Sequence, residues 1–489
     1  MPQASVYNRY NPDDASPDEE PPLYAKQRRI YPQAVRGNFR RAKWIILCLT
    51  LGIYYLLPFV RWDRGPHAPH QAVLVDFPAR RFYFFAIEIW PQEVYYLTGL
   101  LILAALFLFL SNAVAGRVWC GYLCPQTVWT DLFYAVERWV EGDRRERMRQ
   151  DVGKWTFSIL RQKLLKHGIW ILIAWWTGGA WVLYFSDAPT LVRDLATLQA
   201  PATAWIWIGI LTATTYTLAG FMREQVCTYM CPWPRIQAAL TDEHALNVTY
   251  RYDRGEPRGS FKKTEIARAA GLSGGDCVDC QQCVFVCPTG VDIRNGLQLD
   301  CIQCGLCIDA CDAVMQKVGR PSGLISYDTD INIARRKAGA APVFKIIRPR
   351  TLLYVGLILL VASLMAIRLF TRDEAGIGVL HDRSPLYVRL SDGSIRNGYS
   401  IRIANKKLEP RQFTVSVDGL QDSRLELVGV PVVHDRQVVS VDPDQTREIR
   451  ALVTVPSHRI DRSSRDIWFR LTDTISGETI VAADHFRVP

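Results

Sequence analysis

The sequence predicts a mixed fold, a five-helix polytopic membrane protein that carries a cysteine-rich insert and ends in an antiparallel β-sandwich. Three observations predict it. Five stretches are apolar over nearly 20 residues or more, and a helix needs about 20 residues to cross a hydrocarbon core. Eight of the 13 cysteines lie between residues 277 and 311. The last part of the chain alternates apolar and polar side chains, so the mean hydropathy near zero averages very different segments.

The five predicted membrane helices follow a polar N-terminal segment, residues 1–42. The first part of this segment is rich in Pro and acidic residues and cannot bury enough apolar surface to order itself, so we expect disorder there. Between the first two helices, the aromatic stretch from Phe82 to Trp90 carries Glu88 and ends at Pro91, which is typical of an interfacial or re-entrant piece. The helices are expected at residues 44–60, 94–113, 169–185, 202–222 and 351–370.

Basic residues near the helix ends predict the orientation of the chain. Seven Lys and Arg and no acidic residue lie between Lys26 and Lys43, and nine more lie between Arg138 and Lys166. Cytoplasmic loops carry such an excess. The N-terminus and the insert, residues 223–350, are therefore placed in the cytoplasm, and residues 372–489 in the periplasm. Much of the net charge of +10 then comes from basic residues that set the orientation of the chain in the membrane. No nucleic-acid binding is therefore expected.

Alternation of apolar and polar residues marks the C-terminal segment. It is clear in residues 399–404, 412–417 and 467–471, which are separated by Asp-Gly, Asn-Gly and Pro-containing turns. Period-two alternation with turns at short intervals predicts a small sandwich of the immunoglobulin-like type. No cysteine follows Cys311, so this sandwich would lack an inter-sheet disulfide, and we interpret it as a structural or docking module.

The cysteines between residues 277 and 311 form two regular runs. They read Cys277-x2-Cys280-x2-Cys283-x3-Cys287-Pro288 and Cys301-x2-Cys304-x2-Cys307-x3-Cys311-Asp312. This is the pattern of bacterial ferredoxins with two 4Fe-4S clusters, in which the fourth cysteine of each run ligates the other cluster. A structural zinc site, the alternative, normally has longer gaps between its ligand pairs. We predict one cluster held by Cys277, Cys280, Cys283 and Cys311, and a second held by Cys301, Cys304, Cys307 and Cys287.

A second cysteine motif occurs twice, each time after a predicted membrane helix. The copies read Val118-Trp-Cys120-Gly-Tyr-Leu-Cys124-Pro125 and Gln225-Val-Cys227-Thr-Tyr-Met-Cys231-Pro232. The i, i+4 spacing stacks both thiols on one helical face if the helix persists to the proline. Soft sulfur ligands near one membrane surface, with Met230 in the motif, suit Cu(I) better than a hard cation. A disulfide pair or a helix-packing feature is the alternative, and Cys48, alone in the first helix, is expected in the core.

Two absences from the sequence narrow the redox chemistry. None of the eight histidines lies in a predicted span, which disfavours a membrane haem with paired axial histidines. No Gly-x-Gly-x-x-Gly fingerprint of a flavin or nicotinamide site stands out. The reductant is therefore expected to be another protein, a cytoplasmic electron donor.

Taken together, these motifs resemble the cytochrome oxidase accessory family known as CcoG, FixG or RdxA, found in the cytoplasmic (inner) membrane of Gram-negative bacteria. Twin Cys-x3-Cys-Pro motifs with a ferredoxin insert also occur in membrane quinol dehydrogenases of nitrate and nitrous oxide respiration, but the C-terminal sandwich favours the accessory family. The resemblance covers nearly the whole chain: the helices, both repeats, the eight-cysteine insert, the stretches Arg81-Phe-Tyr-Phe-Phe and Ile89-Trp-Pro-Gln, and the sandwich.

The resemblance implies that the protein reduces Cu(II) to Cu(I) during assembly of a cbb-type haem-copper oxidase, in contact with a copper chaperone or other copper-transport or oxidase-assembly factors. Electrons would enter from the cytoplasmic donor, pass the two clusters, and reach copper at the residues expected to be catalytic, Cys120, Cys124, Cys227 and Cys231. Two alternatives stay open. One is electron exchange with membrane quinone, and the other is a non-enzymatic copper-binding scaffold whose clusters stabilise or sense.

Overall fold

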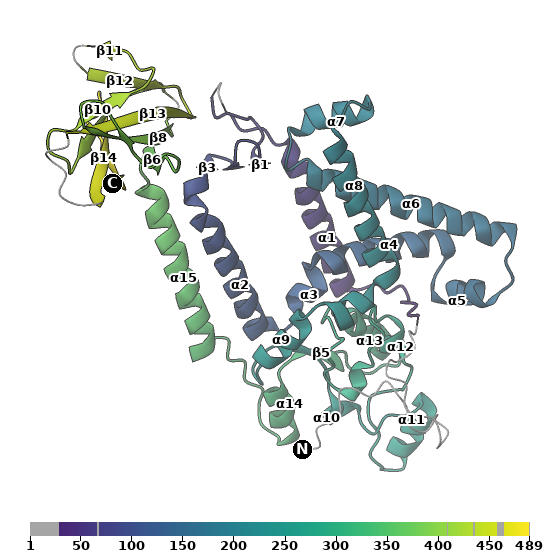
Figure 1. The fold of residues 1–489 in the computed structure, drawn as a ribbon. Helices are drawn as coiled ribbons and strands as arrows, with labels where there is room; N and C mark the ends of the chain where they lie inside the picture. Colours follow the sequence, from purple (N-terminus) through teal and green to yellow (C-terminus); the bar gives the residue numbers. More distant parts are fainter. Residues whose placement is uncertain (1–28, 66–67, 408, 434–435, 457–463, 489) are drawn as a thin grey trace, which may run out of the picture. The chain divides into compact units, whose positions relative to one another are not determined.

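The computed structural model of the chain describes residues 29–65, 68–407, 409–433, 436–456 and 464–488. The Pro- and acid-rich stretch up to about Leu23, for which disorder is expected, lies outside these ranges. The chain divides into two compact units, one of residues 1–60 and 71–365 and one of residues 61–70 and 366–489. The first unit is mainly helical and holds all 13 cysteines, and the second is a β-sandwich (Figure 1).

Four of the described helices are long and apolar enough to cross a membrane. Each falls within a few residues of a predicted span, which confirms several apolar helices of membrane-crossing length. α1 continues into the short 3-10 turn η2, and α8 continues into the π-helix η4. The bounds are α1 (Asn38–Leu56), η2 (Leu57–Phe59), α2 (Tyr95–Ala115), α8 (Ala202–Thr215), η4 (Tyr216–Met222) and α15 (Pro349–Phe370).

The remaining predicted span, residues 169–185, differs from the prediction. It lies in a longer helix, α6 (Phe157–Val182), which starts well before residue 169. Its first turns carry Arg161, Lys163 and Lys166, so its apolar part is shorter than the about 20 residues that a span needs. α6 is not among the four helices that qualify within the described residues, and the five-helix count is therefore not confirmed.

α6 nevertheless lies along α8 and η4 over its whole apolar length. At one end, a Cβ added to Gly220 would lie 3.3 Å from the ring of Trp170. In the middle, a Cβ on Gly178 would lie 3.0 Å from the carbonyl oxygen of Ile208. At the other end, Val182 and Leu183 pack with Ala204 and Ile208. The two helices therefore form an antiparallel pair, joined through α7 (Ala188–Ala196).

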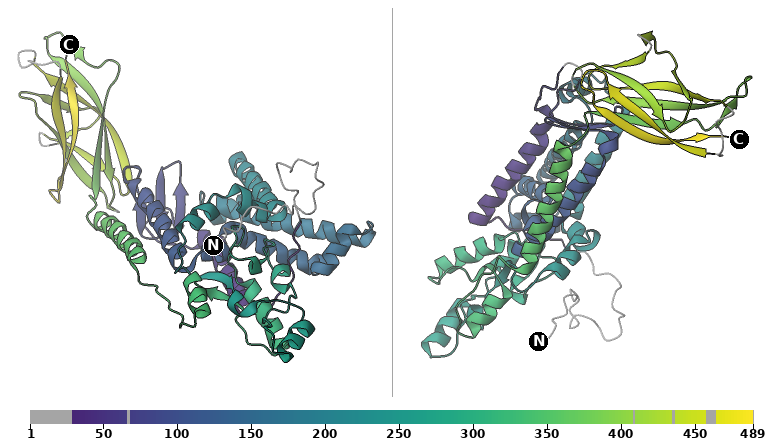
Figure 2. Two further views of the ribbon diagram at one scale, coloured as in Figure 1. Left: turned by 90° about the horizontal axis from the view of Figure 1, so that it is seen from below. Right: turned by 90° about the vertical axis from the view of Figure 1, so that its left-hand side faces the viewer.

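α2 and α15 form a second pair of apolar helices (Figure 2). Gly99 leaves room for the Met365 side chain, which an added Cβ would overlap. The rings of Phe109 and Tyr354 lie 6.1 Å apart between the same two helices. Small residues at helix contacts let backbones approach closely, which is how apolar helices associate in a lipid environment.

The eight-cysteine part of the chain caps the start of α1. Asp309, on helix α13 (Leu306–Lys317), accepts hydrogen bonds from the backbone N–H groups of Phe39 at 3.2 Å and Arg40 at 2.8 Å. A Cβ on Gly37, the residue before the helix, would overlap the Asp309 carboxyl group. Glycine thus leaves space for a carboxylate at the positive end of the helix dipole.

Replacing Asp309 with alanine is expected to lower the free energy of unfolding by about 1 kcal/mol, the usual cost of losing a helix cap. The reason is that two N–H groups at the start of α1 lose their acceptor. The midpoint of thermal unfolding in detergent micelles measures this loss. Asp309→Asn keeps an acceptor oxygen and should lose less. Equal midpoints for wild type and Asp309→Ala would contradict the capping role.

The basic part of the predicted N-terminal segment is packed ahead of the first helix. α1 begins at Asn38, and residues 29–37 have no regular secondary structure but are partly buried. The Gln33 N–H donates to the carbonyl of Phe285 at 2.8 Å, and Arg147, on α5 (Arg144–Val152), donates to the carbonyl of Pro32. Local composition could not reveal this order because the partners lie far away in the sequence.

The stretch from residue 82 to 90 forms strands instead of a re-entrant piece. β1 (Val73–Asp76), β2 (Arg81–Phe84) and β3 (Ile87–Ile89) make a three-stranded antiparallel sheet. Arg81 pairs with Glu88 at 2.9 Å and lies over the ring of Trp90 at 3.9 Å from its centroid. Glu88 is therefore the partner of an arginine on the neighbouring strand.

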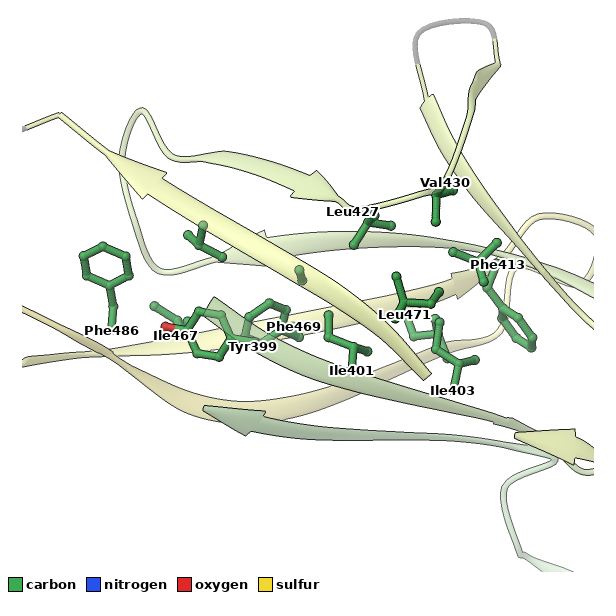
Figure 3. Close-up of a cluster of buried hydrophobic side chains, with 14 of the residues drawn as sticks. Tyr399, Ile401, Ile403, Phe413, Leu427, Val430, Ile467, Phe469, Leu471 and Phe486 are labelled. Atoms are coloured by element: carbon green, nitrogen blue, oxygen red, sulfur yellow. The ribbon is translucent and has the colours of Figure 1, made fainter. Parts of the chain in front are cut away.

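The second unit is the predicted sandwich. Its two sheets have the strand orders β10-β13-β8-β6, with β7 beside β8, and β11-β12-β9-β14-β15. Tyr399 and Ile401 on β8 face Phe413 on β9 and Phe469 on β14 across the core (Figure 3). The three alternating stretches of the sequence fall in β8, β9 and β14, which confirms the sandwich. The bounds are β6 (Ala375–His381), β7 (Val388–Arg389), β8 (Ile395–Asn405), β9 (Arg411–Asp418), β10 (Arg424–Leu427), β11 (Val432–Val433), β12 (Arg436–Val441), β13 (Gln445–Val455), β14 (Ser464–Asp473) and β15 (Thr479–Arg487).

Candidate metal centres

Two cavities in the eight-cysteine part of the chain are lined by cysteines. Each contains three cysteines of one run and the fourth cysteine of the other run, the grouping that the spacing predicts. The rest of their walls is mainly apolar, for example Leu324 and Ile325 in the first and Val248 and Ile302 in the second. Iron ligation by these thiols stays a prediction. The first cavity is lined by Cys277, Cys280, Cys283 and Cys311, and the second by Cys287, Cys301, Cys304 and Cys307, with Cys283 also in its wall.

The two cysteine runs turn in the same way around their cavities. Asp279 and Gln303, two residues after the first cysteine of each run, have φ of 50° and 54°. Gln281 and Gly305, directly after the second cysteine, have φ of 56° and 73°. Such left-handed residues next to helical ones gather backbone N–H groups into a concavity that favours anionic groups such as iron–sulfur clusters. A helix then follows in each run, α12 (Gln282–Phe285) or α13.

The chemistry of these walls fits iron–sulfur clusters. Burial raises the pKa of both Cys283 and Cys301 to about 12, so these thiols ionise at neutral pH only when a bound cation replaces the proton. The Val291 N–H donates to Sγ of Cys287 at 3.3 Å, and hydrogen bonds to sulfur tune cluster potentials. Within the described residues, no three His, Cys, Asp or Glu side chains converge on one ion position. A 4Fe-4S cluster needs no such convergence, because each thiol binds a different iron.

The two Cys-x3-Cys-Pro repeats follow one backbone path. Four residues before the first cysteine, Gly116 (φ 54°, ψ −128°) ends α2 and Arg223 (φ 45°, ψ −114°) ends η4. An L side chain rarely adopts this conformation, and such strained residues and π-helices cluster at functional sites. The following elements are α3 (Val118–Tyr122) and α4 (Pro125–Glu141) in the first repeat, and the π-helix η5 (Val226–Met230) and α9 (Trp233–Leu240) in the second.

The condition for stacking each thiol pair on one helical face, a helix that persists to the proline, is not met. α3 ends at Tyr122 and η5 ends at Met230, so the second cysteine of each pair lies outside the helix. Cys124 and Cys231 have extended backbones with ψ of 126° and 120°. The proline that follows each of them explains this, because it disfavours the helical conformation for the preceding residue.

The four thiols of the repeats nevertheless lie near one another. Burial raises the pKa of Cys120 and of Cys227 to about 12, and the nearby thiols of Cys124 and Cys231 add to both shifts. All four side chains are partly buried, and none forms a disulfide. They do not converge on one ion position within the described part of the chain, so binding of a single copper ion requires side-chain rotation. We call these four residues the thiol site.

The first repeat packs directly on the loop of the second cysteine run. The Tyr122 hydroxyl donates to the carbonyl of Cys304 at 2.9 Å. A Cβ on Gly121 would lie 2.7 Å from the carbonyl oxygen of Ile302 and 3.1 Å from Cα of Cys304, so glycine allows this close approach. Cys120 packs against the apolar cluster that contains Ile302 and Cys304. The thiol site therefore adjoins the second cysteine-lined cavity.

Two polar side chains hold this junction together. The Arg117 guanidinium donates to the carbonyls of Cys301 at 3.4 Å and Pro234 at 2.9 Å, and so links the first repeat, the second cysteine run and α9. Gln237 is fully buried on α9, and its Oε1 accepts from Sγ of Cys120 at 3.3 Å. Both contacts fix the position of Cys120.

Buried charges position the second repeat. Glu137, on α4, is 1% exposed and pairs with Arg147 at 3.0 Å, Arg223 at 3.2 Å and Lys166 at 3.8 Å. Gln126, next to the proline of the first repeat, donates to the carbonyl of Arg223 at 3.2 Å. The helix that follows the first repeat thus holds the strained residue that precedes the second.

Replacing Glu137 with glutamine is expected to lower the free energy of unfolding by about 3–5 kcal/mol, because the buried Arg147 and Arg223 lose their carboxylate partner. Burial acts to raise the pKa of Glu137, but Arg223, Arg147 and Lys166 hold it below its ordinary value. The carboxylate therefore stabilises the fold above about pH 4.3, its unfolded pKa, and this stabilisation is lost as the pH falls through the lowered value.

Thermal unfolding in detergent between acid and neutral pH measures both effects. Glu137→Gln should unfold at a lower temperature at neutral pH and show a weaker dependence on acid. The matched control is Glu146→Gln, which removes an exposed carboxylate from the neighbouring helix α5 and should leave both properties unchanged. Equal unfolding of the two variants would contradict the role of Glu137.

Several residues of the site were not singled out from the sequence. Gly121 lies at a variable position inside the first Cys-x3-Cys-Pro motif, and Gln237 and Glu137 belong to no motif. Cys48 differs from its prediction, because it is exposed on α1 instead of buried in the core. Met230 also lies at the surface, 57% exposed.

Three family models match this chain. A 4Fe-4S dicluster domain matches residues 222–330, which contain both cysteine runs and Cys227 and Cys231. A 4Fe-4S binding domain matches residues 97–144, whose cysteines are Cys120 and Cys124. The IG-like fold at the C-terminus of FixG matches residues 365–489. The cysteine-rich part is thus an iron–sulfur domain and the sandwich is immunoglobulin-like.

Curated relatives match over nearly the full length. Nitrogen fixation protein FixG of Rhizobium meliloti is 48% identical and covers 96% of this chain and 94% of its own. RdxA and RdxB of Cereibacter sphaeroides are each 49% identical, over 92% and 95% of this chain and 95% and 97% of their own. A crystal structure of a FixG-related protein from Vibrio parahaemolyticus is 23% identical, with a TM-score of 0.21, over 24% of this chain and 96% of that one. Because FixG, RdxA and RdxB are 48–49% identical over at least 92% of this chain, the chain belongs to the FixG family.

Proposed function

We propose that this FixG-family protein is a membrane-bound iron–sulfur oxidoreductase that reduces Cu(II) to Cu(I). The contact between the first repeat and the loop of Cys304 carries the proposal, since it joins the thiol site to the second cysteine-lined cavity. A 4Fe-4S cluster, when bound, stores and donates single electrons. Reduction of Cu(II) to Cu(I) takes one electron, so the two sites match in electron number.

The thiol site has the ligands that favour the reduced product. Thiolates are soft ligands that select Cu(I), whereas Cu(II) prefers nitrogen and oxygen ligands. In our proposal Cys120, Cys124, Cys227 and Cys231 are the catalytic residues, because they contact the copper that is reduced. Cu(I) then passes to a copper chaperone or another copper-transport factor for assembly of a cbb-type cytochrome oxidase, and a soluble cytoplasmic protein supplies the electrons.

We propose five membrane crossings, with α6 as the third. The support is that α6 lies along the full apolar length of α8 and η4, which qualify as a span by themselves. Together with the basic residues near the helix ends, five crossings put the N-terminus and the iron–sulfur domain in the cytoplasm and the sandwich in the periplasm. A reporter fused after Pro489 should be active only outside the cytoplasm. Activity only in the cytoplasm would contradict five crossings.

Stopped-flow absorbance of the chemically reduced protein tests the reaction. Cu(II) should bleach the reduced iron–sulfur absorbance rapidly in wild type, and slowly when Cys120, Cys124, Cys227 and Cys231 are changed to serine. Cys48→Ser is the matched control, because this exposed cysteine lies in neither set, and it should behave as wild type. Oxidation by quinone alone, at equal rates in all variants, would reject copper reduction in favour of quinone chemistry. Copper binding without oxidation by either acceptor would favour the scaffold.

A second candidate for the thiol site is a third iron–sulfur cluster. The observation that favours it is the match of a 4Fe-4S binding domain to residues 97–144. Iron analysis distinguishes the two candidates. If the thiol site takes copper, the serine variants at its four cysteines keep the wild-type iron content. If it holds a cluster, they lose about a third of the iron, as one cluster of three.

A further inference from the structure

A basic cavity lies beside the start of the first membrane helix. Its volume is about 420 Å³, within the range of small-ligand sites. It is lined by the packed N-terminal segment, by α4 and by loops of both cysteine runs. Its charged side chains are four arginines and one carboxylate: Arg36, Arg40, Arg41, Arg138 and Asp131.

The single carboxylate does not neutralise this wall. Both oxygens of Asp131 accept from Nη1 of Arg40 at 2.9 Å, and Lys43 lies 3.8 Å from one of them. Asp131 is thus shared by two cations. Among the described residues, no carboxylate lies within 4.0 Å of the charged groups of Arg36, Arg41 or Arg138.

Arg40 keeps an unused donor in this wall. The residue is 8% exposed, and its Nη2 is buried with no hydrogen-bond partner in the described part of the chain. A buried guanidinium donor without an acceptor is costly, and an anion in the cavity would satisfy it. Burial lowers the pKa of Arg138, and the guanidinium groups of Arg40 and Arg147 lower it further in spite of Asp131 and Asp143.

The cavity opens where the apolar part of α1 begins. Its wall includes Trp44, and the Arg40 guanidinium lies 4.6 Å from the centroid of this ring. Tryptophan and arginine at the end of a membrane helix are typical of the headgroup level of a bilayer. Guanidinium groups bind phosphate through paired N–H donors.

We infer that this cavity binds a phosphate group, supplied by the headgroup of an anionic phospholipid at the membrane surface. Basic pockets between membrane helices on the cytoplasmic side bind such headgroups. Val286 and Pro288, on either side of Cys287, form part of the same wall. A bound headgroup would therefore contact the loop of the iron–sulfur domain and the start of α1 together, and fasten the domain to the bilayer.

Native mass spectrometry of the detergent-solubilised full chain tests the site. The probes are short-chain phosphatidylglycerol, short-chain phosphatidylcholine and inorganic phosphate. The test variant is R36Q/R41Q/R138Q, which leaves the Arg40–Asp131 pair intact. The matched control is R145Q/R149Q/R161Q, which removes three exposed arginines from α5 and α6.

Wild type and the control should bind phosphatidylglycerol about a hundredfold more tightly than the test variant, from the usual contribution of each basic residue near anionic lipid. Phosphatidylcholine should bind weakly to all three. If wild type binds inorganic phosphate but not phosphatidylglycerol, and the test variant loses this binding, the phosphate site is kept and its ligand is free phosphate instead of a lipid headgroup. The inference would be overturned if phosphatidylglycerol bound equally to wild type and the test variant. It would also be overturned if wild type bound phosphatidylglycerol and phosphatidylcholine equally.

Discussion

Replacing Gly121 with valine is expected to slow the oxidation of the chemically reduced protein by Cu(II) several-fold. The added side chain would overlap the carbonyl oxygen of Ile302, and a main-chain atom cannot turn aside as a side chain can. The first repeat must then move away from the loop of Cys304. The greater distance between the thiol site and the second cysteine-lined cavity then slows electron transfer, because its rate falls as the distance between donor and acceptor grows.

The iron content separates this effect from a loss of the clusters. Gly121→Val should keep the wild-type iron content, because Gly121 lines neither cysteine cavity. Gly209→Val, on α8, is the matched control, since an added Cβ there meets no atom within 4 Å, and it should oxidise as wild type does. A Gly121→Val protein with full iron and wild-type oxidation rates would show that electrons do not pass through this contact.

Replacing Cys287 with alanine is expected to remove half of the iron and to abolish fast oxidation by Cu(II). Replacing Cys311 with alanine should remove the other half of the iron but keep the fast oxidation by Cu(II). The reason is the exchange of the fourth cysteines between the runs. Cys287 lines the cavity of Cys301, Cys304 and Cys307, which adjoins the thiol site. Cys311 lines the other cavity.

Iron analysis and stopped-flow oxidation of the dithionite-reduced variants measure both properties. Each variant is the control for the other, because both lose one predicted ligand from the end of a run. Fast oxidation in Cys287→Ala together with slow oxidation in Cys311→Ala would place the electron donor to copper in the cavity of Cys277, Cys280 and Cys283. That result would contradict the role of the contact between Tyr122 and Cys304.

The cysteine groupings could be predicted from the sequence, because ligand spacing within a tight loop depends on local covalent geometry. The contacts of the same cysteines could not. Tyr122 and Cys304 are separated by 182 residues, and Phe39 and Asp309 by 270. No pattern within one segment specifies such a pair. The packing of the first repeat on the iron–sulfur domain therefore follows only from the tertiary structure.

The membrane helices and the sandwich were predictable for a related reason, since hydropathy and alternation are local signals. The differences arise where neighbouring segments decide the outcome. α6 extends into a basic stretch because Glu141 on α4 pairs there with Lys163 and Lys166. The pairs of thiols do not share helical faces because Pro125 and Pro232 end the helices before Cys124 and Cys231. This second effect was readable from the sequence, because the residue before a proline is biased away from the helix.

Electron transfer from the iron–sulfur domain to copper is tested most directly by rapid-freeze-quench EPR, which follows the Cu(II) signal and the reduced-cluster signal in the same samples. Both signals should decay together, one electron per copper, with the four thiols of the thiol site still reduced afterwards. Thiols can also reduce Cu(II) by forming disulfides. Loss of the Cu(II) signal with an unchanged cluster signal and oxidised Cys120, Cys124, Cys227 and Cys231 would contradict electron transfer from the clusters.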